Sequence, residues 1–396
     1  MHERKCQDFI GFGCCKKWVI NSLDVKSAFL QGKRIERDLY ILPPKDFRKG
    51  NTLWKLNKVV YGLCDASRNW YLRVLEVLNQ LQVKETSLDK SVFVYRTQEI
   101  EGIILIHVDD ILYFGSERFL SRVMDKFKTT FQISRNEAQA FKYLGIQMRQ
   151  KTDCVEMNQN EYLESISPDL VSKEKMIDKE RFANEIEKRA FKQGVGQIGW
   201  MVSISKPEAA FSYCNLSVVQ SRPRMKDFFK FKKLVNELGN YKSFINIHKI
   251  NLNELKISVF SDASFGNLAD GSSQLGFIIF MQDNADRVVP ISWASKKCKR
   301  VARSTLTAET LAALEAVDAA MASKAVIEEI LDRRLPPVNL YIDNKSLFDT
   351  ARTSNVLSEK RLMIDMSALR QMIDRSEVII EWVSTENQVA DILTKD

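Results

Sequence analysis

The sequence predicts a multidomain protein of the α/β and α+β classes. Its 396 residues exceed what one hydrophobic core usually organises, so two or three domains are expected. After about residue 250, the segments follow the order three strands, helix, strand, helix, strand, helix, which is typical of a mixed β-sheet with flanking helices. The first half also alternates between β-prone and helix-like segments.

A β-hairpin with two acids at its tip is predicted in the first half. Residues 103–108 and 111–114 are short apolar runs, and Asp109 and Asp110 separate them. This pattern is typical of two antiparallel strands joined by a tight turn. Another β-prone segment runs into Asp24, so we expect a further strand to end there.

Helices and linkers are expected between the two halves. A helix is predicted around residues 66–81. Residues 168–190 are rich in charged side chains and indicate an exposed loop and a polar helix, which gives one candidate domain boundary. A second candidate boundary lies at residues 240–255, where a basic helix-like stretch at 226–233 gives way to an alternating strand pattern.

The order of elements after this second boundary predicts one mixed sheet. Its longest helix is marked by apolar residues at helical spacing: Leu311, Leu314, Val317 and Met321. Strands are expected at residues 257–261, 276–281, 288–293, 338–342 and 378–383. Shorter helices are expected near residues 345–351 and 361–372, and a last one at the C-terminal end.

Composition narrows the compartment and the class of partner. Lys and Arg number 59 against 51 Asp and Glu, and the net charge of +8 mildly favours a polyanionic partner. Seven cysteines without a C-x-x-C pair indicate free thiols in a reducing, intracellular compartment. Three scattered histidines argue against structural zinc. No apolar stretch approaches the roughly 20 residues of a membrane span, and no signal peptide is recognisable.

Four acids of the last region fall at the ends of predicted elements: Asp262, Glu309, Asp343 and Asp391. If the fold brings them together, their oxygens form a site for Mg²⁺. Two such ions roughly 4 Å apart activate water and stabilise the leaving oxygen of a phosphodiester. Each acid alone also has an ordinary explanation. Asp262 and Asp343 are suited to capping a turn or a helix, and the helix dipole favours Glu309 in a first turn.

Five blocks of this region resemble, in order and spacing, the ribonuclease H (RNase H) blocks of copia-type retrotransposon polyproteins. They are residues 259–264 (VFSDAS), 291–297 (ISWASKK), 304–309 (STLTAE), 341–344 (YIDN) and 385–395 (TENQVADILTK). The resemblance implies an RNase H-like fold in which the four acids bind the catalytic metal ions. The sequence departs from the family pattern at Met363, which stands where a histidine is usual.

Two upstream segments resemble the polymerase motifs of the same elements. Residues 23–32 (LDVKSAFLQG) are similar to motif A, and residues 107–110 (HVDD) to the Tyr-Val-Asp-Asp box, with histidine in place of tyrosine. The resemblance implies that Asp24 and Asp109 bind the ions that activate a primer 3′-hydroxyl and neutralise a triphosphate, with Asp110 as the adjacent acid. An isolated Asp-Asp pair at a turn is more often ordinary turn chemistry.

The resemblance also assigns two residues to nucleotide binding. Phe29 takes the place of an aromatic steric gate that excludes a ribose 2′-hydroxyl, although it suits a hydrophobic core equally well. Residues 61–71 (YGLCDASRNWY) are similar to the next family block, with Cys64, Asp65 and Ser67 in place of lysine, glutamine and proline. Because a thiol and an acid replace a cation and an amide, we expect weakened triphosphate binding.

Later segments have two interpretations each. Residues 141–146 are similar to the primer grip, and residues 198–201 and 206–211 to the connecting region before RNase H, but a hydrophobic turn and a packed helix explain them as well. In residues 222–233 cations alternate with phenylalanines. This run is suited to holding phosphates while its rings pack inward, or to forming a solvated helix face.

The resemblance predicts three domains. The family places a fingers subdomain before motif A, which begins here at residue 23, so truncated fingers are expected. The predicted parts are a reverse transcriptase palm with truncated fingers (1–118), a thumb and connection region (119–250) and an RNase H-like domain (251–396).

The predicted function is that of a reverse transcriptase and RNase H fragment of a retrotransposon polyprotein. We expect hydrolysis of RNA in RNA·DNA hybrids and RNA-templated DNA synthesis, the latter impaired by truncation. Each active site would hold two Mg²⁺ ions, with Mn²⁺ as a substitute. The expected partners are an RNA template, a DNA primer, the hybrid and deoxynucleoside triphosphates, in the cytoplasm or a virus-like particle and without a membrane. The alternative is a non-catalytic nucleic-acid-binding relic.

Overall fold

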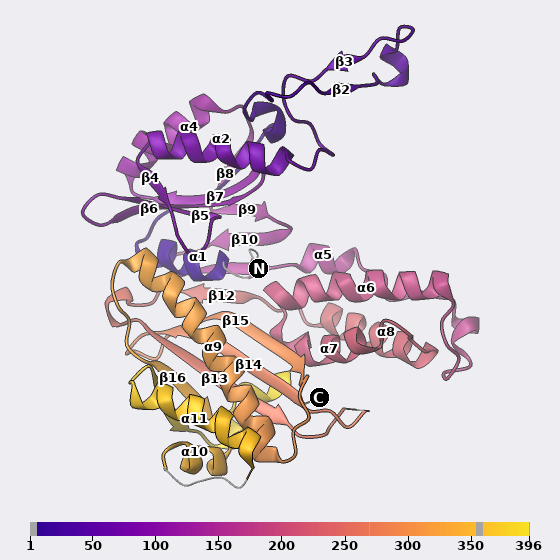
Figure 1. Ribbon diagram of the computed structural model, residues 1–396, viewed down its shortest axis with the longest axis vertical. Helices are drawn as coiled ribbons and strands as arrows, with labels where there is room; N and C mark the ends of the chain where they lie inside the picture. The colour runs from indigo at the N-terminus through magenta and orange to yellow at the C-terminus, as the bar shows by residue number, and fades with distance from the viewer. Residues whose placement is uncertain (1–5, 269, 354–358, 396) are drawn as a thin grey trace. The chain divides into compact units, whose positions relative to one another are not determined.

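The computed structural model describes residues 6–268, 270–353 and 359–395 (Figure 1). The chain divides into two compact units. The smaller unit comprises Lys17–Leu144 and Glu329–Leu331, and the larger unit comprises the described part of Met1–Lys16, Gly145–Glu328 and Asp332–Asp396. The boundaries of these two units differ from those of the three expected domains. The domain boundaries therefore remain a prediction. Within the described residues no helix is long and apolar enough to cross a membrane.

A six-stranded antiparallel sheet forms the smaller unit (Figure 1). In spatial order its strands are β4 (Val83–Glu85), β5 (Val92–Arg96), β6 (Ile100–His107), β7 (Asp110–Gly115), β1 (Ile20–Val25) and β8 (Ile133–Ala138). The predicted strand into Asp24 and the hairpin at Asp109 and Asp110 are confirmed. A short strand, β9 (Ala140–Tyr143), follows β8.

Helices cover one face of this sheet (Figure 1). They are α2 (Ala66–Gln80), α3 (Glu117–Phe119) and α4 (Asp125–Thr130), the last two joined by a π-helical turn at Leu120–Met124. Their apolar faces share one buried core with the sheet, in which Trp70, Phe119 and Phe127 are almost fully buried. The helix predicted around residues 66–81 is confirmed.

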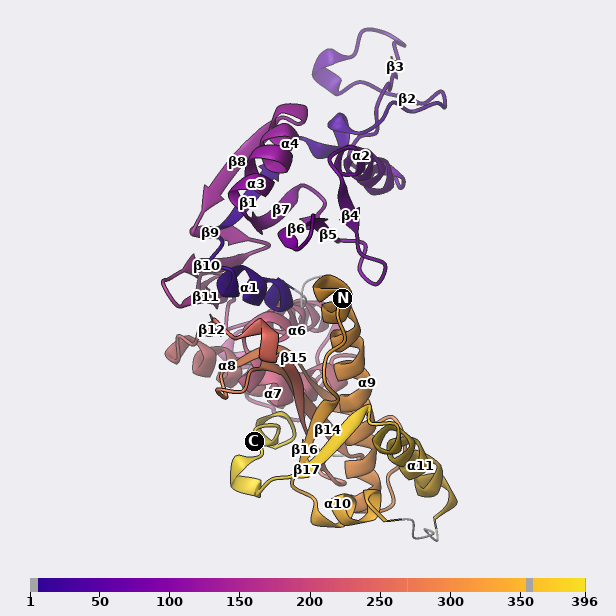
Figure 2. The same ribbon diagram turned by 90° about the vertical axis from the view of Figure 1, so that its left-hand side faces the viewer.

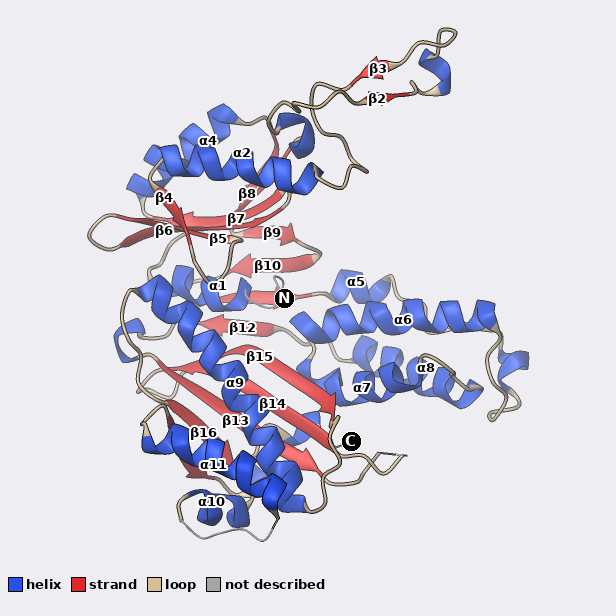
Figure 3. Ribbon diagram, viewed as in Figure 1, coloured by secondary structure: helices blue, strands red, loops and turns tan. Residues whose placement is uncertain are grey.

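A short hairpin stands apart from the six-stranded sheet within the smaller unit (Figure 3). It pairs β2 (Tyr40–Ile41) with β3 (Trp54–Lys55), and a 3₁₀ turn at Lys45–Phe47 lies between them. Its large apolar side chains, including Phe47 and Trp54, are exposed. Two-residue strands without a packed face contribute little stability of their own.

The larger unit opens with α1 (Cys6–Cys15) and continues with three short antiparallel strands and four helices. The strands are β10 (Ile146–Gln150), β11 (Cys154–Asn158) and β12 (Ile245–His248). The helices are α5 (Asn160–Glu164), α6 (Glu185–Ile204), α7 (Ala210–Val219) and α8 (Met225–Asn240). In α8 the rings of Phe228 and Phe231 are buried and that of Phe229 is exposed, so two of the three phenylalanines in the basic run pack inward.

The C-terminal part contains the predicted mixed sheet of five strands (Figure 2). In spatial order they are β15 (Val288–Lys297), β14 (Gln274–Gln282), β13 (Lys256–Ser264), β16 (Val338–Ile342) and β17 (Val378–Trp382). The first three run antiparallel, and β13, β16 and β17 run parallel. The predicted helices are α9 (Thr305–Leu331), α10 (Lys345–Ala351) and α11 (Lys360–Asp374). The order of elements read from the sequence is confirmed.

The short helix expected at the C-terminal end is wrong in detail. Two separate 3₁₀ turns, Thr385–Asn387 and Asp391–Leu393, take its place. The segment forms hydrogen bonds with the sheet and does not continue as one helix. The Gln388 side chain donates to the Ser261 carbonyl at 3.0 Å, and the Ser295 hydroxyl donates to the Leu393 carbonyl at 2.5 Å.

Candidate functional site

Three of the four predicted acids of the C-terminal part meet in one place. Asp262 lies in β13, Glu309 near the start of α9, and Asp343 directly after β16. One carboxylate oxygen from each lies within 4.8 Å of the others. Since β13 and β16 are parallel neighbours, Asp262 and Asp343 reach the same edge of the sheet. The Ser304 hydroxyl caps α9 by accepting from the Thr307 amide, which sets the helix start beside that edge.

Burial raises the pKa values of two acids in this cluster. Asp262 is 1% exposed and Glu309 is 4% exposed. Burial, reinforced by the charges of Asp262 and Asp343, raises the pKa of Glu309 to about 9. Burial also raises the pKa of Asp262, against the hydrogen bond from Thr394. Glu309 Oε2 is buried without a hydrogen-bond partner. An orphaned oxygen among buried acids fits a hard divalent cation, whose ligands are oxygens.

Asp391, the fourth predicted acid, lies outside that group of three but remains connected to it. Its carboxylate receives the Lys395 ammonium at 2.9 Å, and the same ammonium lies 3.6 Å from Asp262. The Thr394 hydroxyl donates directly to Asp262. Thr385 at the start of the segment donates to Asp343 at 3.1 Å. The C-terminal segment therefore contacts two of the clustered acids as well as carrying the fourth.

The sequence assigned no role to Thr394 and Lys395, although both stand in the block that carries Asp391. The threonine and the lysine follow the acid by three and four residues, a spacing that returns side chains to one face of a helical turn. That spacing was the available signal for both residues.

In the smaller unit the hairpin brings three acids together. Asp24 of β1 lies opposite Asp110 of β7, and Asp109 occupies the turn before it with its carbonyl accepting from the Val25 amide at 3.0 Å. Burial raises the pKa of Asp110, and the charges of Asp109 and Asp24 raise it further. Val108 completes the turn with a φ of 56°, a left-handed conformation that few non-glycine residues adopt. Three carboxylates therefore lie close together at the tip of this hairpin.

Neighbouring side chains contact these acids, and the sequence did not single them out as site residues. The Ser134 hydroxyl of β8 donates to the Asp24 carboxylate. Arg135 lies 3.8 Å from Asp110. Burial, followed by the charges of Asp109 and Asp24, raises the pKa of the exposed Tyr61 phenol.

The two predicted nucleotide-binding residues lie in different settings. Phe29 is 8% exposed within the hydrophobic core, and its ring lies 4.5 Å from that of Tyr61. It thus belongs to the core and also packs against the exposed ring of Tyr61. Asp65 precedes α2 and forms an ion pair of 2.8 Å with Arg37, so part of its charge is neutralised.

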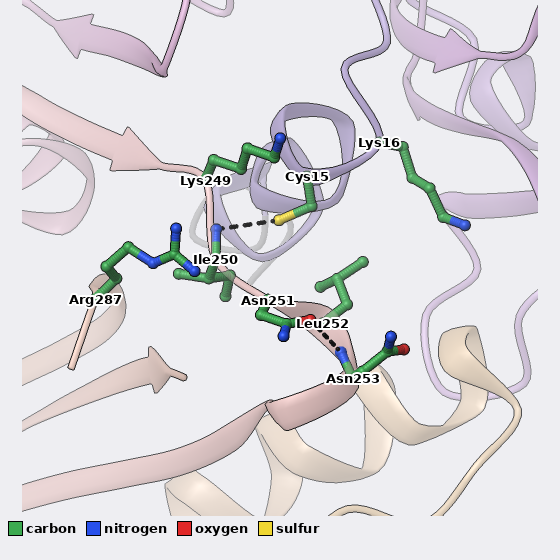
Figure 4. Close-up of a pocket in the computed structure, with 8 residues that line it drawn as sticks. All are labelled: Cys15, Lys16, Lys249, Ile250, Asn251, Leu252, Asn253 and Arg287. Carbon is green, nitrogen blue, oxygen red and sulfur yellow. Dashed lines mark hydrogen bonds between the residues drawn. The ribbon is translucent and has the colours of Figure 1, made fainter. Parts of the chain in front are cut away.

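A cavity of about 370 Å³ in the larger unit holds none of the predicted site residues (Figure 4). It is lined by residues at the end of α1, between β12 and β13, and at Arg287: Cys15, Lys16, Lys249, Ile250, Asn251, Leu252, Asn253 and Arg287. The Cys15 sulfur accepts a hydrogen bond from the Ile250 amide at 3.3 Å, and burial raises the pKa of its thiol. The Arg287 guanidinium is paired with buried Asp283.

Comparisons with known proteins agree with the geometry. Residues 6–187 match the family model described as reverse transcriptase (RNA-dependent DNA polymerase). Over 98% of its length the chain is 26% identical to the Retrovirus-related Pol polyprotein from transposon RE1 of Arabidopsis thaliana. Over 95% it is 25% identical to that from transposon TNT 1-94 of Nicotiana tabacum. The chain spans only 27% and 30% of these two relatives.

One solved structure matches nearly the whole chain in fold. The foamy viral protease-reverse transcriptase in complex with RNA/DNA hybrid covers 93% of this chain with a TM-score of 0.53, and the match extends over 44% of the viral protein. Sequence identity is 12%, so this likeness concerns the fold alone.

Proposed function

Because residues 6–187 belong to the reverse transcriptase family and the C-terminal part of this copia-type polyprotein region has an RNase H-like fold, we propose that the larger unit hydrolyses RNA in RNA·DNA hybrids. The observation that carries the proposal is the cluster of Asp262, Glu309 and Asp343, in which one carboxylate oxygen from each lies within 4.8 Å of the others and two of the three side chains are buried. The foamy viral relative was solved with an RNA/DNA hybrid, which supports this class of substrate.

In such a site the acids would bind the cations and two threonines would orient the acids. Asp262, Glu309 and Asp343 would hold Mg²⁺, or Mn²⁺ in its place, and Asp391 would complete the charge at the open side. Two bound ions supply water activation and stabilisation of the leaving oxygen. Thr394 fixes one oxygen of Asp262 by hydrogen bonding, and Thr385 does the same for Asp343. These bonds orient the carboxylates before a substrate arrives, as partners of metal ligands commonly do.

RNA-templated DNA synthesis is the companion activity that we propose for the smaller unit. Asp24 and Asp109 would hold the ions, with Asp110 adjacent, and Phe29 would support Tyr61 beside an incoming deoxynucleoside triphosphate. Asp65 stands where the family pattern has an amide and is engaged by Arg37, so we expect weak triphosphate binding. RNA template and DNA primer are the partners that this activity requires.

The test is an assay of the purified chain on an end-labelled RNA·DNA hybrid with Mg²⁺, beside primer extension on a poly(rA) template. We expect cleavage of the RNA strand, lost in EDTA and in Asp262→Asn. Glu237→Gln, an exposed acid on α8, is the matched control and should cleave as the unchanged chain does. A non-catalytic nucleic-acid-binding relic would instead bind the hybrid without cleaving it, with affinity unaffected by Asp262→Asn.

A further inference from the structure

The acid cluster of the larger unit contains one cation of the chain itself. The Lys395 ammonium lies 2.9 Å from Asp391 and 3.6 Å from Asp262. Asp262 is buried and belongs to the group of three acids that would hold a divalent ion, and Asp391 is the fourth acid of the proposed site. A monovalent positive charge therefore occupies the side of the cluster where Asp391 joins it.

The backbone around Lys395 is fixed by contacts with the sheet. The Asn267 side chain donates to the Thr394 carbonyl at 3.2 Å, and Ser295 holds the Leu393 carbonyl. Gly276, the strand partner of Asp262, permits this close approach. A Cβ at that position would lie 2.7 Å from the Cβ of Leu393. The lysine side chain itself is 45% exposed.

The charge of Lys395 bears on how these acids bind a divalent cation. Like charges gathered in a buried site destabilise one another unless a cation is present. We propose that Lys395 is an internal counter-ion that competes with the divalent cation for Asp262 and Asp391 and so sets the cation affinity of the site. The inference rests on the proposed function, because it takes these acids to be the cation ligands.

Displacement of the ammonium requires no unfolding. The half-exposed lysine can turn into solvent while Thr394 keeps its hydrogen bond to Asp262. Cation entry then replaces the two ion pairs of Lys395 by coordination of the acids, and the exchange weakens the apparent affinity by the free energy of the pairs that are broken. The site accordingly needs a higher concentration of the divalent cation for half-occupancy than it would need without the lysine charge.

Titration with Mn²⁺ alone, followed by the electron paramagnetic resonance of the free ion, measures this competition without nucleic acid. Lys395→Met keeps the length of the side chain and removes its charge. We expect it to bind Mn²⁺ about 3- to 10-fold more tightly, the range for a partly exposed pair with two acids. Lys395→Arg, which keeps the charge, should stay within about 2-fold of the unchanged chain.

A control separates this effect from a general loss of positive charge. Lys233→Met removes an exposed lysine that pairs with Glu237 on α8, and it should leave Mn²⁺ affinity unchanged. Circular dichroism checks that each variant is folded. All chains in this titration carry Asp109→Asn, which removes a ligand charge proposed for the smaller unit. Unchanged or weaker Mn²⁺ binding in folded Lys395→Met would then overturn the counter-ion role alone, provided that Asp262→Asn removes the remaining binding. If the unchanged chain binds no Mn²⁺ through Asp262, the proposed function fails together with this inference.

Discussion

In the larger unit Asp262 and Glu309 are buried and Asp343 beside them is half-buried, whereas Asp24, Asp109 and Asp110 of the smaller unit are all half-buried near the tip of a hairpin. Glu309 has a buried oxygen without a partner. By contrast, Ser134 donates to Asp24, and the Asp109 carbonyl accepts from Val25. Both clusters accept hydrogen bonds, from Thr394 and Thr385 in the larger unit and from Ser134 in the smaller one, but the first also buries a carboxylate oxygen without a partner.

This difference predicts two kinds of response to a cation. A buried cluster is strained electrostatically until a cation enters, so the stability of the larger unit should depend on divalent ions. Near water, like charges are screened, so the fold of the smaller unit should depend much less on the same ions. Activity and stability are therefore coupled in one unit and nearly independent in the other.

The largest effect expected is a double dissociation of the two activities. Asp343→Asn removes a clustered ligand charge and should lower hybrid cleavage by roughly 100-fold or more, with primer extension unchanged. Asp109→Asn should lower any primer extension by a similar factor and leave cleavage intact. Both activities are measured on the same preparations. Loss of both activities in either variant would mean that the two sites are not independent.

Removal of the aromatic support behind the hairpin should produce the largest loss of stability. Trp70 is 1% exposed, donates to the Val108 carbonyl at 2.6 Å, and packs edge-on against Phe131. Trp70→Ala should lower the free energy of unfolding of the smaller unit by about 3–5 kcal/mol in urea denaturation. Trp54→Ala, the same change on the exposed β2–β3 hairpin, should alter it by less than about 1 kcal/mol. Equal losses would contradict the assigned core.

Local pattern explains which of these features the sequence predicted. Period-2 and helical spacing marked the strands and helices, and the hairpin tip followed from two apolar runs around Asp109 and Asp110. The hydrogen bonds that orient the acids were not predictable in this way. Ser134 reaches Asp24 across 110 residues, and Thr394 reaches Asp262 across 132. Such contacts depend on tertiary register, and no spacing rule within one segment encodes them.

The next effect concerns the close packing of the C-terminal segment on β14. In Gly276→Ala the added methyl would meet the Leu393 and Thr394 side chains at 2.7 and 2.8 Å. We expect the larger unit to lose about 1–3 kcal/mol of stability, because the segment must shift. Hybrid cleavage should fall, since Asp391 moves with it. Gly239→Ala, where the methyl meets nothing within 4 Å, is the control and should not destabilise.

The last effect expected is a pH dependence of stability in the cation-free chain. Burial raises the pKa of Glu309 from 4.5 to about 9, so between these values the folded chain binds a proton that the unfolded chain releases. The stability contributed by this proton is present below pH 4.5 and is lost as the pH rises through about 9. Glu309→Gln lacks this proton, so its stability relative to the unchanged chain should increase with pH.

Thermal unfolding in EDTA between pH 6 and 9 measures the difference between the two chains, in which other titrating groups largely cancel. One proton corresponds to at most about 1.4 kcal/mol per pH unit, or about 3–6 °C for a unit of this size. Excess Mg²⁺ should abolish the trend in the unchanged chain, because the cation replaces the proton at Glu309. A difference that stays constant from pH 6 to 9 in EDTA would mean that Glu309 is already ionised, and the contrast between a strained and an unstrained acid cluster would disappear.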